Sequence, residues 1–252
     1  MCLIVFAWRP GHALPLLVAA NRDEFYPRPS LPLAHWDDQP GIYAGRDLQA
    51  GGTWLGVGPQ GRFAALTNLR DPTQAEGARS RGELPAGFLR SQLSPADFLA
   101  ELQGRASEFS GFNLLLGTTE QLWHYNPRSG APQQLAPGVY GMSNASLDTP
   151  WPKLLRAKSA LAEALASEHE EALFSLLTDR QIAADADLPQ TGIALEFERL
   201  LSSAFISSAS YGTRASTVLK VQADGQRWLI ERSFGPNGVA LGETRLVLDA
   251  PK

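Results

Sequence analysis

The chain contains a single cysteine among its 252 residues. One thiol excludes an internal disulfide framework and any zinc site built from several cysteines. The chain also has no long apolar run: the longest stretches, 3–8 and 13–20, are separated by the turn sequence RPGH, and a membrane-spanning helix needs about 20 apolar residues. The uncharged start and the broken apolar run are not typical of a signal peptide. We therefore expect a cytoplasmic protein with no membrane insertion.

The sequence also has no excess of positive charge. It carries 22 Lys and Arg against 26 Asp and Glu, for a net charge of −4. Because nucleic-acid binding depends on clustered cations, this scattered distribution predicts no nucleic-acid partner. No metal site is predicted, because the four histidines lack ligand-like spacing. They are His12, His35, His124 and His169. A small molecule is the expected partner, and the sequence leads to no prediction of oligomeric state.

Apolar patterning predicts strands at both ends of the chain and helices between them. Residues 2–8 and 14–20 are apolar on both alternating faces, which is typical of a central hairpin of buried strands. A helix is predicted after the capping sequence at Ser94, a longer one from Thr149 to Ala172, and another over 194–205. The segment 71–92 is expected to be loop with weak helix. Further strands are predicted at 41–46, 53–58, 62–68, 112–118, 121–125, 216–221 and 227–233.

This order of elements favours a layered α+β fold over a βαβ repeat. No Gly/Ser-rich or charged linker divides the chain, so we expect one domain over residues 1–252. The segment 56–61 matches G-x-G-x-x-G, the dinucleotide-binding pattern. That pattern needs a helix after it, whereas Pro59 interrupts it here and another strand follows. We interpret the segment as a hairpin turn.

Cys2 is the main candidate for chemistry. If Met1 is removed, Cys2 carries both a thiol and a free α-amine, and the amine, with a pKa of about 7.7 to 8.0, can take the thiol proton. Cys2 would then be a nucleophile with its own base. The alternative is a small buried hydrophobic residue that begins a strand.

The hairpin places the segment Asn21-Arg22-Asp23-Glu24 near Cys2. A turn centred on residues 10 and 11 pairs Cys2 with Ala19, and a turn centred slightly later pairs it with Arg22 or Asp23. Arg22 would lower the thiol pKa, and Asp23 could orient the amine. The alternative interpretation is a charged turn that leaves the sheet.

Motifs along nearly the whole chain resemble the NRDE family, which includes transport and Golgi organisation protein 2. They are Met1-Cys2, the segment NRDE at 21–24, GGTWLG at 51–56, TNLR at 67–70, SRG at 80–82, MSN at 142–144, DTPWPK at 148–153 and YGTR at 211–214. That family in turn resembles the N-terminal nucleophile (Ntn) hydrolases of the penicillin V acylase and bile salt hydrolase type. The resemblance implies a four-layer αββα sandwich.

The resemblance also implies roles for individual residues. Cys2 is similar to the catalytic cysteine, and Asp23 to the aspartate that holds the N-terminal amine. Asn68 and Asn144 resemble the two asparagines near the acyl oxygen, and Arg214 resembles a second active-site arginine. Binding roles are implied for Asn21, Arg22, Trp54 and Arg70.

One position departs from those hydrolases. They carry an arginine three residues before the aspartate, where this chain has Ala20, and Arg22 directly precedes Asp23 instead. Strand alternation would point Arg22 and Asp23 to opposite faces. For the other residues, purely structural roles are the alternative interpretation. Asn68 and Asn144 would bond to their own backbone, Trp54 would be a buried residue after a turn, and Arg214 would be half of a buried ion pair.

Two functions follow from these observations. The first is an Ntn-hydrolase-fold enzyme in which Cys2 attacks an amide or thioester acyl group, with no cofactor required. The alternative is a carrier that binds haem or an acyl-coenzyme A or lipid ligand in the same pocket, since the family is connected with haem trafficking and acyl-coenzyme A handling. Under that alternative Cys2 or a histidine would contact the haem iron. A scaffold with a vestigial pocket is a third possibility.

Overall fold

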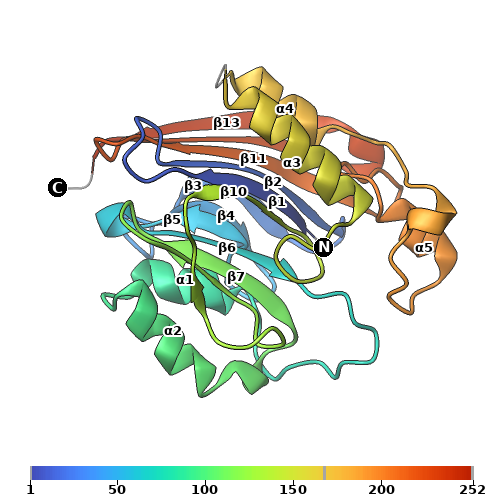
Figure 1. The fold of residues 1–252 in the computed structure, drawn as a ribbon, viewed down its shortest axis with the longest axis horizontal. Helices are drawn as coiled ribbons and strands as arrows, with labels where there is room; N and C mark the ends of the chain where they lie inside the picture. The colour runs from blue at the N-terminus through green and yellow to red at the C-terminus, as the bar shows by residue number, and fades with distance from the viewer. Residues whose placement is uncertain (1, 167–168, 251–252) are drawn as a thin grey trace.

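Two antiparallel sheets pack face to face, and helices cover their outer surfaces (Figure 1). The computed structural model describes residues 2–166 and 169–250. The first sheet has six strands in the order β10-β1-β2-β11-β12-β13. Their bounds are β1 Cys2–Trp8, β2 Leu16–Phe25, β10 Gly138–Met142, β11 Tyr211–Val221, β12 Arg227–Phe234 and β13 Ala240–Leu248.

The second sheet has seven strands in the order β3-β4-β5-β6-β7-β8-β9. All of its neighbouring strands are antiparallel, and their order in the sheet is the order along the chain. Their bounds are β3 Ser30–His35, β4 Tyr43–Asp47, β5 Leu55–Val57, β6 Phe63–Asn68, β7 Phe112–Gly117, β8 Leu122–Tyr125 and β9 Gln133–Gln134.

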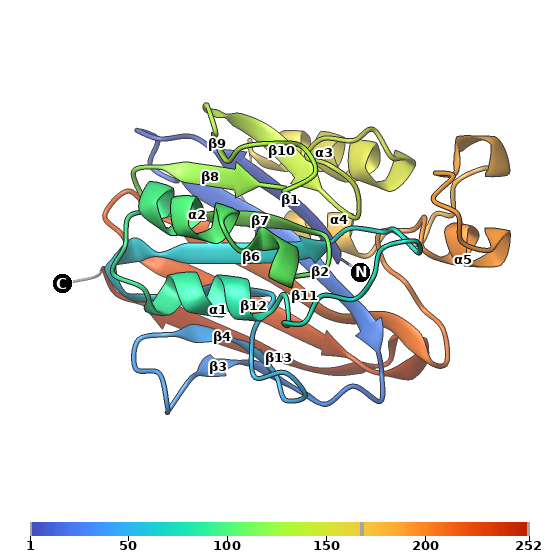
Figure 2. The same cartoon turned by 90° about the horizontal axis from the view of Figure 1, so that it is seen from below.

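The helices complete four layers. The first sheet is covered by α3 (Pro152–Ala164) and α4 (Glu170–Leu177), whose leucines pack on Leu3 and Val5. The second sheet is covered by α1 (Glu83–Arg90) and α2 (Pro95–Gln103), which lie across β6 and β7 in Figure 2. A separate apolar core fills the space between the sheets. This arrangement is the predicted αββα sandwich.

Alternation along β1 decides where its side chains point. Leu3 and Val5 contact the helices, whereas Ile4 and Phe6 belong to the core between the sheets. Successive strand residues face opposite sides, so Cys2 shares the side of Ile4 and faces the second sheet. The sequence thus places the thiol at one end of the space between the sheets.

Several sequence predictions are confirmed. The Oγ of Ser94 accepts a hydrogen bond from the N–H of Asp97 at 3.1 Å, as a capping residue of α2. The G-x-G-x-x-G segment forms a short 3₁₀ turn, Pro59–Gly61, between β5 and β6, with no helix after it. The predicted tight turn before β12 contains Gly225 with a φ of 89°.

None of the helices in the described part of the chain has both the length and the apolar character that a membrane span requires.

Other predictions are wrong in detail. The predicted long helix from Thr149 to Ala172 is two elements, because α3 ends at Ala164 and α4 begins at Glu170. The helix predicted over 194–205 is only α5, Leu195–Leu200. No strand was predicted over 30–35, where Pro32 is unfavourable for a central strand, but β3 is an edge strand and so tolerates it. The strands β9, β10 and β13 and the full helix α1 were not predicted.

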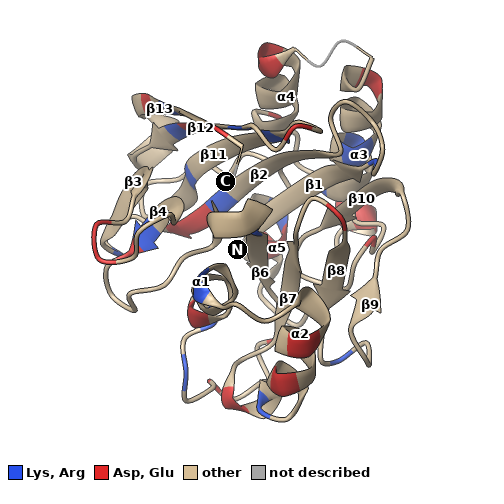
Figure 3. Ribbon diagram, turned by 90° about the vertical axis from the view of Figure 1, so that its left-hand side faces the viewer, with Lys and Arg blue, Asp and Glu red and all other residues tan. Residues whose placement is uncertain are grey.

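Charged positions of both signs are dispersed over the side of the molecule shown in Figure 3. Many are paired on the surface, as in the pair that Arg232 of β12 forms with Glu243 of β13 at 2.8 Å. Exposed pairs of this kind contribute little to stability. Other charged side chains, among them those of Arg22 and Asp23, are buried at the Cys2 end of the two sheets.

Candidate active site

Cys2 lies directly opposite Arg22 in the sheet. The β1–β2 ladder pairs Cys2 with Arg22, Leu3 with Asn21 and Ile4 with Ala20. The connection runs from Arg9, whose N–H donates to Pro15 O at 2.7 Å, so it is longer than a turn centred on residues 10 and 11. The alternative register with Ala19 is therefore not formed. Because paired residues share a face, Cys2 and Arg22 both face the second sheet.

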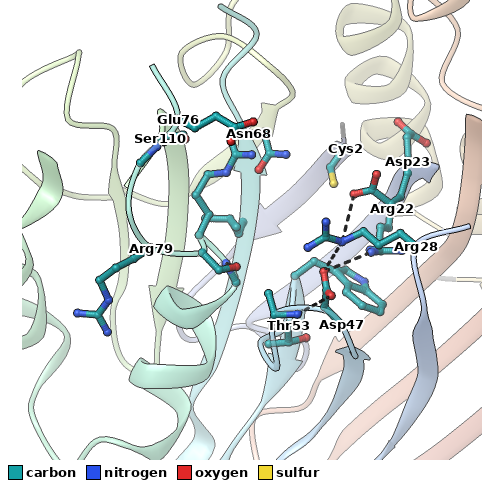
Figure 4. Close-up of a pocket in the computed structure, with 18 of the residues that line it drawn as sticks. Cys2, Arg22, Asp23, Arg28, Asp47, Thr53, Asn68, Glu76, Arg79 and Ser110 are labelled. Atoms are coloured by element: carbon teal, nitrogen blue, oxygen red, sulfur yellow. Dashed lines mark hydrogen bonds and ion pairs between the residues drawn. The ribbon is translucent and has the colours of Figure 1, made fainter. Parts of the chain in front are cut away.

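A cavity of about 350 Å³ opens beside the thiol, between the ends of the two sheets (Figure 4). In the view, the sulfur lies across from Asn68, with Arg22 and Arg28 on its own side. Three segments supply most of the lining: the end of β2, the loop after β4 and the loop before α1. The charged residues of the lining are Arg22, Asp23, Glu24, Arg28, Asp47, Glu76, Arg79 and Arg81.

Arg22 is held from two sides. Its guanidinium lies over the Trp54 ring at 4.3 Å, and its Nη2 lies 3.9 Å from Asp47 Oδ2. Asp47 is fixed by Arg28, whose Nε donates to Oδ2 at 2.7 Å. The Arg22 side chain is only 6% exposed, yet its Nη1 has no hydrogen-bond partner among the described residues. The cavity wall therefore offers one unused, buried, cationic donor near Cys2.

Asp23 points away from this face. Its Oδ1 accepts a hydrogen bond from Thr213 Oγ1 at 2.7 Å, and Thr213 is its partner on β11. Burial raises the pKa of Asp23, while nearby positive charges, including that of Lys153, and the Thr213 hydroxyl oppose the rise. Lys153, on α3, is itself buried, and burial lowers its pKa to about 8. Alternation thus separates Arg22 and Asp23, as predicted, and both remain next to Cys2.

The thiol itself is poorly solvated. Burial raises the pKa of Cys2, and the charge of Asp23 adds to this rise. A hydrogen bond from the Asp23 backbone N–H and the positive charge of Arg22 act in the opposite direction. Since a thiolate is the reactive form, this environment requires a nearby base for nucleophilic chemistry.

The two candidate asparagines lie next to each other. Asn68, at the end of β6, lines the cavity, and its carbonyl accepts a hydrogen bond from Asn144 Nδ2 at 2.8 Å. Asn144 is 2% exposed and follows Ser143, whose Oγ donates to the Cys2 carbonyl at 3.0 Å. The segment after β10 therefore ties the start of β1 to the end of β6.

Four candidate residues lie outside the cavity lining: Asn144, Arg214, Arg70 and Asn21. Arg214 lies at a β-bulge, and its Nη1 donates to the carbonyls of Phe25 and Arg28. Arg70 pairs with Glu198 at 2.6 Å, both side chains being almost completely buried.

Asn21 is a structural link. Its Nδ2 donates to the carbonyls of Leu177 and Ala204, each at 2.8 Å. These bonds fasten β2 to the helical layer on the far side of the sheet from Cys2.

Sequence reasoning assigned no role to several residues of the site. Arg28 and Asp47 lie in a proline-rich segment and at a strand end, where no local pattern marks them. Arg81 lies in the SRG motif at 80–82, to which the family resemblance assigns no role. Lys153 lies in the DTPWPK motif, and only the packing of α3 against the first sheet brings its charge near Asp23.

Sequence comparison assigns the chain to a protein family. The family model "Transport and Golgi organisation 2" matches residues 1–236. The chain belongs to this family. It is 37% identical to the "Transport and Golgi organization protein 2 homolog" of Bos taurus, with 93% of each chain covered, and 35% identical to that of Homo sapiens, with 97% of each covered. The Drosophila melanogaster protein is 28% identical, with 93% of this chain and 92% of that protein covered.

A solved structure shows the same fold at low sequence identity. The Cys2→Ala mutant of a conjugated bile acid hydrolase from Clostridium perfringens matches with a TM-score of 0.55 and 7% identity, over 99% of this chain and 92% of that chain. The fold is therefore Ntn-hydrolase-like. Among the described residues, no group of three or more His, Cys, Asp or Glu side chains could hold a metal ion.

Proposed function

We propose that this protein is a hydrolase of amide or thioester acyl groups and that Cys2 is its nucleophile. The observation that carries the proposal is the pairing of Cys2 with Arg22 at the wall of a cavity that Asn68 also lines. The Ntn-hydrolase-like fold supports the same reaction class. The proposal requires removal of Met1, a residue that lies outside the described part of the chain.

The reaction uses the α-amine of Cys2 as base. The amine takes the proton of the thiol, and the sulfur attacks the carbonyl carbon, whose π electrons move to the oxygen. When the carbonyl re-forms, the bond to the leaving amine or thiol breaks and the ammonium returns its proton to that group. Water then attacks the acyl-cysteine with the amine again as base, which releases a carboxylic acid and restores the thiol.

The surrounding residues supply the electrostatics. The unused Nη1 of Arg22 favours the thiolate or the developing oxyanion, and Asn68 can donate to that oxyanion from the opposite wall. Asp23, held by Thr213, is suited to hold the protonated amine in place. These roles of Asp23 and Asn68, and the expected position of Asn144 near the acyl oxygen, remain predictions.

The haem alternative does not fit the cavity. A porphyrin needs apolar walls, whereas the described residues of this lining carry eight charged side chains and include no histidine. Cys2 would be the one iron ligand in the lining. We therefore derive no step through haem, and a carrier of another acyl ligand is the alternative outcome of the experiments below.

The first experiment is the intact mass of the untagged protein, expected to lack Met1. The second is acyl transfer from a panel of amides and thioesters, with detection of an acyl adduct on Cys2 by mass. Cys2→Ala should lower turnover by about 10⁴-fold or more, because the nucleophile is lost. A matched control inserts Glu between Met1 and Cys2, which keeps the thiol but leaves no free amine on it.

The outcomes separate the two functions. Turnover and adduct in the wild type, absent from both variants, support the hydrolase. Equal turnover by Cys2→Ala, or a wild type that binds an acyl thioester without turnover or adduct, contradicts it and favours the carrier.

A further inference from the structure

Two arginines of one loop line the cavity in very different states. Arg79 is exposed, and its side chain donates to Glu83 at 3.0 Å and to Glu108 at 3.2 Å. Arg81, two residues later, is half-buried, and its Nη1 donates to the carbonyl of Gly111 at 3.3 Å. Among the described residues, no carboxylate lies within ion-pair distance of Arg81.

Burial of Arg81 has an energetic consequence. It lowers the pKa of this guanidinium, and the charges of Cys2 and Glu24 are close enough to oppose that fall. A cation that loses hydration without a paired anion is costly to the free protein. Such a group is a candidate for binding an anion, because the ligand then supplies the missing partner.

Most acids of the cavity are already engaged. Asp47 binds Arg28, Asp23 binds Thr213, and Glu24 Oε1 accepts the N–H of Phe25 at 2.8 Å. Glu76 is the exception, and it is exposed at the rim. None of these described carboxylates is paired with Arg81, whereas Arg22 and Arg28 both lie within ion-pair distance of Asp47.

The helix α1 begins beside Arg81 and fixes its position. Its N-cap, Gly82, lines the cavity, and the N–H groups of Gly82 and Glu83 donate to Ser80. The loop is held rigidly, since the Thr53 N–H donates to the Gly82 carbonyl at 3.1 Å. A Cβ added at Gly52 would lie 2.3 Å from the Gly82 carbonyl carbon, which shows how closely the two segments pack.

We propose that Arg81 binds an anionic group of the ligand, a carboxylate or a phosphate, beside Cys2. Naming this ligand a substrate rests on the proposed function, but the anion site itself does not. A carboxylate would belong to the far end of the acyl group, and a phosphate would belong to the leaving group. Arg81 is thus assigned as a specificity-determining residue.

The test measures binding to the Cys2→Ala protein, so that turnover cannot interfere. Three thioesters are compared by calorimetry: butyryl-pantetheine, which is neutral, succinyl-pantetheine, which adds an acyl carboxylate, and butyryl-4′-phosphopantetheine, which adds a leaving-group phosphate. We expect one charged probe to bind at least about tenfold more tightly than the neutral one, which corresponds to about 1.4 kcal/mol. The preferred probe identifies the source of the anion.

Variants in the same Cys2→Ala protein locate the site. Arg81→Gln removes the charge and keeps a donor for Gly111, and it should reduce the preference to within about twofold. Arg79→Gln removes the same charge from the same loop and should keep the preference. Arg81→Lys, which retains the charge, should keep part of the preference and serves if the Gln variant has a lowered melting temperature.

Equal binding of all three probes overturns the anion site, as does a preference that survives in Arg81→Gln. A preference that depends on Arg81, in a wild type that turns over none of these probes or the earlier acyl panel, supports the anion site and contradicts the hydrolase. Turnover without any preference for a charged probe supports the hydrolase and contradicts the anion site.

Discussion

Adjacent residues of β6 belong to two buried polar regions that differ in how well their groups are bonded. Thr67 belongs to a network centred on Asn113, whose Nδ2 donates to Thr67 Oγ1 at 3.0 Å and to Ala145 O at 2.7 Å. The Oδ1 of Asn113 accepts from Asn126 Nδ2 at 3.0 Å and lies 3.2 Å from His124 Nε2. Every polar atom of the Asn113 side chain is thus bonded.

The neighbouring region lacks this completeness. Asn68 faces the Cys2 cavity, where Arg22 Nη1 is buried without a hydrogen-bond partner among the described residues. Buried polar groups are normally satisfied, because an unsatisfied one costs about 1 to 3 kcal/mol. We infer that the Asn113 network stabilises the fold, whereas the Cys2 region retains unused donors for a ligand.

The largest expected effect separates the two regions by activity. Asn68→Ala should lower the turnover number by about 10²- to 10³-fold, the typical effect of losing one oxyanion donor. Its carbonyl, which accepts from Asn144, belongs to the backbone and is retained, so the melting temperature should change little. Steady-state kinetics and thermal unfolding measure the two effects. Unchanged turnover with a large loss of stability would place Asn68 with the structural region.

Asn113→Ala should show the opposite pattern. It removes the partner of Thr67, His124 and Asn126 in a fully buried site, so we expect a loss of about 3 kcal/mol in the free energy of unfolding. Urea unfolding measures that loss, and kinetics at a temperature where the variant is folded should give a turnover number within about twofold of the wild type. A loss of turnover without a loss of stability would show that Asn113 contributes to activity, so that the two regions would not have separate roles.

The Asn113 network also predicts acid sensitivity. Burial lowers the pKa of His124 to about 4, and its Nε2 donates as N–H to Asn113 while the ring is neutral. Between about pH 6.5 and pH 4 the unfolded chain binds a proton that the folded chain does not, so stability falls as pH falls. The fall should be about 3 kcal/mol.

His124→Gln is the matched control for this pH effect. It should lack this part of the pH dependence when unfolding is followed across the same range. An identical pH profile in the two proteins would show that His124 is not the titrating group.

Sequence patterns identify the parts of this molecule that depend on local contacts. The Ser94 cap and the β1–β2 hairpin were predictable, because capping and alternation act within a few residues. Helix α1 was not, because Leu84, Phe88 and Leu89 find their apolar partners only in the packed second sheet.

The same limit applies to the site. Cys2 and Asp23 could be singled out, because a hairpin brings them together. The role of Arg70 could not be read from the TNLR motif, since its partner Glu198 is 128 residues away. Arg214 follows the expected motif, but a bulge between Thr213 and Ala215 shifts the strand register there. Arg81 owes its importance to a partner that is missing, and no sequence pattern describes this.

The smallest expected effect concerns the residue that joins the two regions. Ser143 Oγ donates to the Cys2 carbonyl at 3.0 Å, and the Ser143 carbonyl lies 3.5 Å from Asn113 Nδ2. Ser143→Ala removes the buried hydroxyl that lies within hydrogen-bond distance of both the Cys2 carbonyl and Asn144 Oδ1, so we expect a loss of about 1 kcal/mol in unfolding free energy. It should also lower turnover by less than about tenfold, since the start of β1 loses a support while the reacting groups remain. Asn113→Ala should not add to this loss of turnover in the double variant. If it does, the two regions act as one unit, and stability and activity cannot be assigned to separate sets of side chains.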